Sequence, residues 1–99
     1  MVMKTFKDLV FGKRNSGGVR ARMDFDNGFA ISVIAGEHPY STPRVNNPDP
    51  DFFEEFEIAV FTSDGDWATR KFLPELDDDV VGWQNRGQIN ALMLLIQSK

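Results

Sequence analysis

With 99 residues, 41% of them hydrophobic, the chain is long enough for one domain with a single core and too apolar for global disorder. It has no cysteine, which excludes disulfides, thiol catalysis and thiolate metal sites, and it has no apolar run of the roughly eighteen residues that a membrane span needs. The net charge of −4 argues against direct binding to nucleic acid, which requires clustered Lys and Arg, and the whole composition fits one cytoplasmic domain over residues 1–99.

The first predicted element is a β-hairpin. Residues 19–25 and 29–35 alternate apolar with polar or small side chains, and Asp26-Asn27-Gly28 lies between them. A three-residue loop sets Ala21 opposite Val33 and keeps each face of the hairpin uniform, whereas a two-residue loop would mix polar and apolar side chains. We therefore expect a bulged turn in which Gly28 adopts the left-handed conformation.

A long proline-rich loop follows over residues 36–52. It holds four prolines, the only histidine and the only tyrosine, and loops of this length are usually functional or disordered. His38 is the sole candidate general base at neutral pH, but neighbours in a loop do not make a catalytic triad, so we expect a protein that is not an enzyme. Tyr40 and Arg44 are residue types that anchor interfaces. His38, Tyr40 and Arg44 are thus candidate partner-binding residues, and an ordinary connection is the alternative.

A second hairpin is predicted further along the chain. Residues 53–62 and 66–72 flank Ser63-Asp64-Gly65, which again suits a three-residue loop. The register makes three cross-strand pairs: Phe56 with Phe72, Val60 with Ala68, and Glu57 with Lys71. The two hairpins together predict a four-stranded antiparallel sheet.

Phe61 and Trp67 would pair on the face of this sheet that is turned away from Phe56 and Val60. That face is either covered by the N-terminal segment, which is the commoner arrangement, or exposed as an interaction patch. Phe61 and Trp67 are therefore candidate partner-binding residues as well.

An acidic turn, Asp77-Asp78-Asp79, comes next. Carboxylate oxygens suit Mg²⁺, but consecutive side chains of an extended segment cannot all point one way, so we expect no metal ion and no cofactor. Residues 23–99 hold five basic and fourteen acidic residues, a net charge of −9, against +5 for residues 1–22. Asp77, Asp78 and Asp79 are thus candidate contacts for a protein partner with a basic surface, with solubility alone as the alternative.

The C-terminal segment predicts an amphipathic helix. Asn85 and Gln88 have the spacing of a capping box. Four apolar residues recur at helical spacing and should pack on the sheet: Ile89, Leu92, Met93 and Ile96. Leu94 falls on the opposite side of the helix. The expected fold is α+β, with an antiparallel four-stranded sheet of two bulged hairpins and this helix packed on one face.

Four segments carry a resemblance to known proteins: residues 27–33 (NGFAISV), 36–40, 56–60 (FEIAV) and 78–83 (DDVVGW). In this order, before a terminal helix, they resemble a group of small uncharacterised phage and prophage proteins. The resemblance implies no catalytic residues. It implies a phage accessory protein in the cytoplasm of a bacterial host, which binds a host or phage protein and inhibits a defence or nucleic-acid-binding protein. The alternative is a structural or assembly protein that acts as a homo-oligomer, through Leu94 and the Phe61/Trp67 face.

Overall fold

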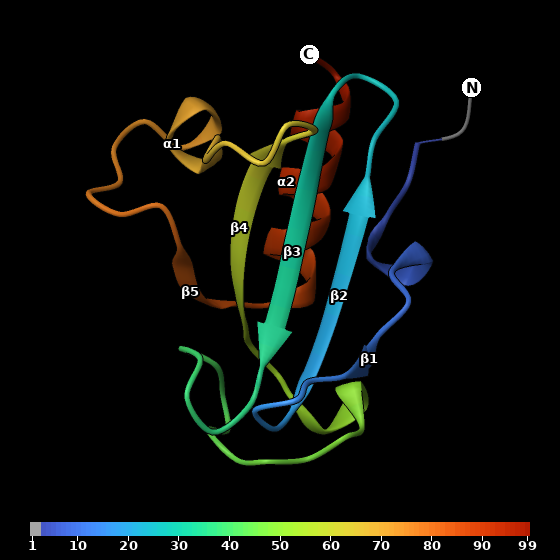
Figure 1. Ribbon diagram of the computed structural model, residues 1–99, viewed down its shortest axis with the longest axis vertical. Coiled ribbons are helices and arrows are strands. Elements are labelled where there is room, and N and C mark those ends of the chain that lie inside the picture. The colour runs from blue at the N-terminus through green and yellow to red at the C-terminus, as the bar shows by residue number, and fades with distance from the viewer. Residues whose placement is uncertain (1–2) are drawn as a thin grey trace.

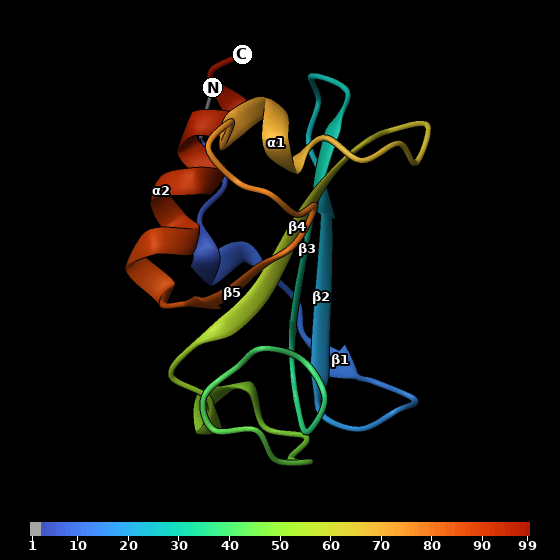
Figure 2. The ribbon, with the colours of Figure 1, turned by 90° about the vertical axis from the view of Figure 1, so that its left-hand side faces the viewer.

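A computed structural model describes residues 3–99 as one antiparallel sheet with a helix packed on one of its faces (Figures 1 and 2). The five strands are neighbours in chain order: β1 (Gly12–Lys13), β2 (Val19–Asp24), β3 (Phe29–Ala35), β4 (Phe56–Thr62) and β5 (Val81–Gln84). The helices are two 3₁₀ turns, η1 (Phe6–Asp8) and η2 (Pro50–Phe52), a short α1 (Thr69–Phe72) and the long α2 (Arg86–Gln97). The α+β class is confirmed, and the strand number is corrected from four to five.

The first hairpin has the predicted register. Ala21 lies opposite Val33 and Met23 opposite Ile31, and the Phe25 N–H donates to the Phe29 carbonyl over 2.8 Å. Gly28 has φ +89°, the left-handed conformation that the three-residue turn requires. The alternation of apolar and polar side chains therefore determined this register.

Replacing Gly28 by alanine is expected to lower the free energy of unfolding by about 1 kcal/mol. A Cβ at this position would meet nothing within 4 Å, so the whole cost comes from the positive φ. Urea unfolding of the two proteins measures the difference. An unchanged midpoint would contradict the left-handed turn.

The second hairpin forms only at its turn. The Thr62 N–H donates to the Asp66 carbonyl and the Ala68 N–H to the Val60 carbonyl, each over 2.8 Å, as the three-residue loop predicts. Beyond Ala68 the chain leaves the sheet and forms α1. The predicted strand over 66–72 is therefore wrong, and so are the pairs Phe56 with Phe72 and Glu57 with Lys71.

The buried Thr69 side chain explains where this pairing stops. Its Oγ1 accepts a hydrogen bond from the Val60 N–H over 2.9 Å and lies 2.6 Å from the Asp79 carbonyl, to which it donates. This hydroxyl bonds to β4 where the backbone of a partner strand would otherwise bond. Through Asp79 it also holds the segment before β5 next to β4. β5 then pairs with β4, so that Phe56 lies opposite Gln84.

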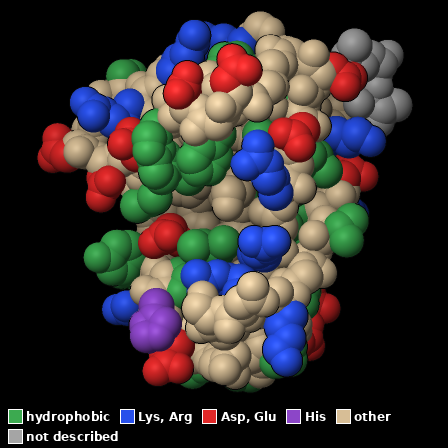
Figure 3. All heavy atoms as spheres, in the orientation of Figure 1, with side chains coloured by type: hydrophobic (Ala, Val, Ile, Leu, Met, Phe, Trp, Pro, Cys, Tyr) green, Lys and Arg blue, Asp and Glu red, His purple; other side chains and the backbone are tan. Residues whose placement is uncertain are grey.

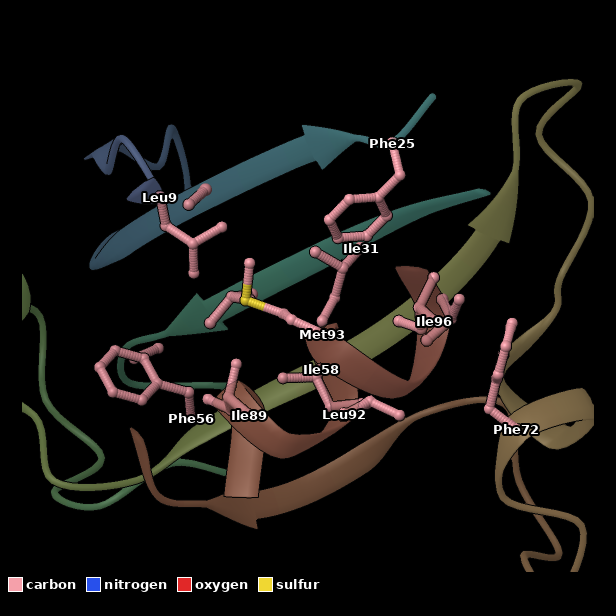
Figure 4. Close-up of a cluster of buried hydrophobic side chains, with 14 of the residues drawn as sticks. Leu9, Phe25, Ile31, Phe56, Ile58, Phe72, Ile89, Leu92, Met93 and Ile96 are labelled. Atoms are coloured by element: carbon pink, nitrogen blue, oxygen red, sulfur yellow. The ribbon is translucent and has the colours of Figure 1, made fainter. Parts of the chain in front are cut away.

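The core lies between α2 and the sheet (Figure 4). The four apolar helix residues named above are buried as predicted, and Asn85 and Gln88 form the capping box. The N-terminal segment packs on the same side: Lys4 makes two backbone hydrogen bonds to the Gln97 side chain, and the Phe6 ring lies 5.6 Å from that of Phe56. This segment therefore covers the helix side of the sheet and leaves the Phe61/Trp67 face uncovered, contrary to the commoner arrangement expected above.

No helix within residues 3–99 is both long enough and apolar enough to cross a membrane.

Candidate functional site

The face of the sheet opposite α2 is the candidate site, and we call it the open face. No helix of the described chain lies on it (Figure 2), and Figure 3 views it directly. Because side chains alternate along a strand, the residues of β2 to β4 that do not enter the core point to this side. Hydrophobic side chains and basic side chains (Lys or Arg) gather here side by side (Figure 3).

The first aromatic pair on the open face is Phe61 with Trp67. Their ring centroids are 4.8 Å apart at an interplanar angle of 35°, and Trp67 is 55% exposed. The turn at residues 63–65 places Trp67 directly across from Phe61, with Gly65 at φ +93°. The Arg22 guanidinium lies 5.8 Å from the Phe61 ring centroid, within cation–π range. Both residues predicted for this face are thus joined in one exposed cluster.

The second aromatic pair is Tyr40 with Trp83. Their rings stack with centroids 5.0 Å apart, and they are 45% and 51% exposed. The Trp83 N–H donates to the Tyr40 carbonyl over 2.8 Å, which fastens the long loop to β5. The Arg44 guanidinium lies 5.4 Å from the Tyr40 ring centroid. This arrangement repeats the first pair, two rings and an arginine, at the β5 end of the sheet.

Trp83 was missed by the sequence analysis. It has φ +54°, and within residues 3–99 it is the only residue other than glycine with a positive φ. A bulky side chain is a clear outlier in this region, and such strain is often kept where a side chain has a function. Gly82 makes the stack possible, because a Cβ there would lie 2.5 Å from the Tyr40 Cβ. The available signal was a tryptophan preceded by glycine, outside every predicted element.

The long loop is held against the sheet. Ser41 is buried, with its hydroxyl bonded to the Gly36 N–H and carbonyl, and Thr42 bridges to Glu55 of the segment before β4. His38 is exposed, and its backbone carbonyl accepts a hydrogen bond of 2.9 Å from Arg44. The structure thus brings together His38, Tyr40 and Arg44, the candidate residues of this loop.

Two adjacent hollows form a groove on the open face. One is lined by Arg20, Arg22, Ser32 and Phe61, and the other by Ile34, Ala59, Trp67 and Val80, again with Ser32 and Phe61. Figure 3 shows the depression beneath the upper hydrophobic cluster. Glu57 also lines the second hollow, where its carboxylate accepts a hydrogen bond of 3.2 Å from the Tyr40 N–H. The groove therefore has an apolar floor, arginines on its β2 side and one carboxylate on the other.

The acidic turn lies apart from the groove, in the connection between α1 and β5. Asp77 and Asp78 are exposed, and the Asp78 carboxylate accepts a hydrogen bond of 2.7 Å from the Asp79 N–H. Asp79 lines a separate surface hollow together with Trp67 and Arg70. Within residues 3–99 no three His, Cys, Asp or Glu side chains are grouped to hold a metal ion. The turn is thus a neighbour of the first aromatic pair and not part of the groove.

No protein-family model, curated protein or solved structure matches this chain.

Proposed function

We propose that the chain is a non-enzymatic binding module that engages a protein partner through the open face of its sheet. One observation carries this proposal: two aromatic pairs, each with an arginine against it, lie exposed, the first on a face that no helix of the described residues covers and the second at the β5 end of the sheet. Tryptophan, tyrosine and arginine are the residues most often found at the energetic centre of protein interfaces. Exposed aromatic clusters in a small domain also mark interaction sites.

The partner class in this proposal is a host or phage protein, and the role is that of a phage accessory protein that inhibits a host defence or nucleic-acid-binding protein. The resemblance of residues 27–33 and 78–83 to small phage proteins supports it. The acidic turn supports a partner that also carries a basic patch. Asp77 and Asp78 are exposed and Asp79 lines a hollow with Trp67, so the turn would speed encounter with such a surface.

A second candidate function is assembly as a homo-oligomer. Leu94 and Leu95 are both exposed on the outer side of α2, where two adjacent apolar side chains form a small patch. Light scattering after size exclusion separates the two functions: a monomer at micromolar concentration supports the binding module, and a stable oligomer that Leu94→Asp dissociates supports assembly.

The experiment that tests the binding module removes one ring from each aromatic pair. With the partner captured from bacterial lysate on the wild-type protein, Tyr40→Ala with Trp67→Ala is expected to weaken its binding at least about tenfold, roughly 1.4 kcal/mol. Titration calorimetry with the purified partner measures the dissociation constant. The expected loss follows because the two rings lie exposed and would be buried only in the complex.

Phe52→Ala is the matched control, since Phe52 is a similarly exposed aromatic residue on η2, away from the open face. It should leave the affinity unchanged. Circular dichroism must show an intact fold in every variant. Wild-type affinity in the double variant would remove the open face from the function.

A further inference from the structure

We infer that the groove on the open face takes an acidic polypeptide segment whose apolar side chain seats between Phe61, Trp67 and Val80. The inference rests on the proposed function and specifies the chemistry of the partner segment. It differs from the expectation of a basic partner surface, which concerns the acidic turn and not the groove.

The floor of the groove supplies the apolar seat. Ile34 and Val80 are half-buried and Ala59 is buried, so that together they form a shallow apolar surface beside the exposed Trp67 ring. An aliphatic or aromatic side chain placed here would cover the Trp67 ring and the floor at once. Burial of that surface supplies a non-directional part of the affinity.

The β2 side of the groove supplies the charge. Arg20 is exposed, and among the carboxylates of residues 3–99 none forms an ion pair with it. Arg22 forms an exposed pair with Asp24 over 3.3 Å, and exposed pairs of this kind exchange readily with another carboxylate. A guanidinium binds a carboxylate through two parallel hydrogen bonds. Arg20 is therefore the natural contact for an acidic side chain.

The one carboxylate on the opposite side of the groove does not cancel this preference for an acidic side chain. Glu57 is half-buried and already accepts a hydrogen bond from the Tyr40 N–H. Of the two arginines that line the groove, Arg22 is paired with Asp24, and Arg20 is the one without a carboxylate partner among residues 3–99. An arginine without a partner at the edge of an apolar groove selects an acidic side chain by complementarity.

A polypeptide fits the groove better than single-stranded nucleic acid does. Single strands bind through bases that stack on open aromatic faces and through a series of phosphate contacts. Here the rings of each pair lie against each other, at 4.8 and 5.0 Å, and Arg22 and Arg44 already lie over Phe61 and Tyr40. In the groove only Trp67 then offers an open ring, and two arginines do not make the series of phosphate contacts that a single strand needs.

The test uses fluorescein-labelled peptides of about twelve residues, which extend over about 40 Å and so span the face. The acidic peptide alternates Asp and Glu with Leu and Trp, and its counterpart carries Lys at every acidic position. Fluorescence anisotropy is expected to give the wild-type protein at least about a tenfold preference for the acidic peptide. Arg20→Glu with Arg22→Glu is expected to reverse that preference.

Lys4→Glu with Lys7→Glu is the control, because it changes the net charge equally but lies on the N-terminal segment, on the α2 side. It should keep the preference for the acidic peptide. Amide shifts of the ¹⁵N-labelled protein should move at residues 20–22, 32–34 and 59–61 when the acidic peptide is added. Equal affinity for the two peptides, no binding of the acidic peptide, or an unchanged preference in Arg20→Glu with Arg22→Glu would each overturn the inference.

Three further outcomes also decide the question. Displacement of the acidic peptide by an oligothymidylate at lower concentration would reassign the groove to single-stranded nucleic acid and overturn the inference. A dimer that the arginine variant dissociates would show a second copy in the groove and overturn it as well. If Tyr40→Ala with Trp67→Ala loses the captured partner while the arginine variant retains it, the proposed function stands and only the inference fails.

Discussion

Replacing Phe56 by alanine is expected to lower the free energy of unfolding by about 3–5 kcal/mol. Phe56 is fully buried, and its ring lies 5.6 Å from those of Phe6 and Phe11 and 6.3 Å from that of Phe53. It therefore joins the N-terminal segment, β4 and the segment before it. Since small domains are stable by only about 5–15 kcal/mol, urea unfolding should show a large fall in the midpoint or loss of the folded state.

Phe52→Ala removes the same atoms from an exposed site and is the matched control. It should cost less than about 1 kcal/mol, because half of that side chain is already in water. Losses of similar size at the two positions would contradict the placement of the core.

Gly18→Ala is the second substitution with a large expected effect, about 2–4 kcal/mol of unfolding free energy, because overlap and backbone strain act together. Gly18 has φ +84°, and a Cβ on it would overlap the Ala35 carbonyl oxygen and press on the Gly36 Cα. Both contacts are backbone, so neither can yield by rotation of a side chain. Relief would require the β1–β2 turn to move away from the end of β3.

Gly28→Ala separates the two causes. It has nearly the same positive φ but open space around the added Cβ, so it carries the strain without the overlap. Urea unfolding of both variants should show a clearly larger loss for Gly18→Ala. Equal losses would mean that the turn shifts freely and that the close approach of Gly18 to Ala35 does not constrain the fold.

The sequence alone was sufficient where short-range patterns carry the information. The alternation over residues 19–35 and the glycine at 28 determined the first hairpin. A shift of the register by one residue would point every core side chain of the hairpin toward solvent. The capping box and helical spacing did the same for α2, whose buried face was predicted residue by residue. Phe61 and Trp67 were also paired correctly, since a three-residue turn brings them together.

Only the tertiary structure decided the rest. Residues 66–72 have the composition of a strand, but the Thr69 hydroxyl accepts the hydrogen bond of the Val60 N–H in β4. The strand that pairs with β4 is β5, which follows the acidic turn. The Tyr40–Trp83 stack joins residues 43 positions apart, and it depends on Gly82 and on a left-handed tryptophan. Likewise, the side on which the N-terminal segment packs follows from contacts between Lys4 and Gln97 at opposite ends of the chain. Such contacts depend on which distant surfaces fit together, and neither local propensity nor periodicity contains that information.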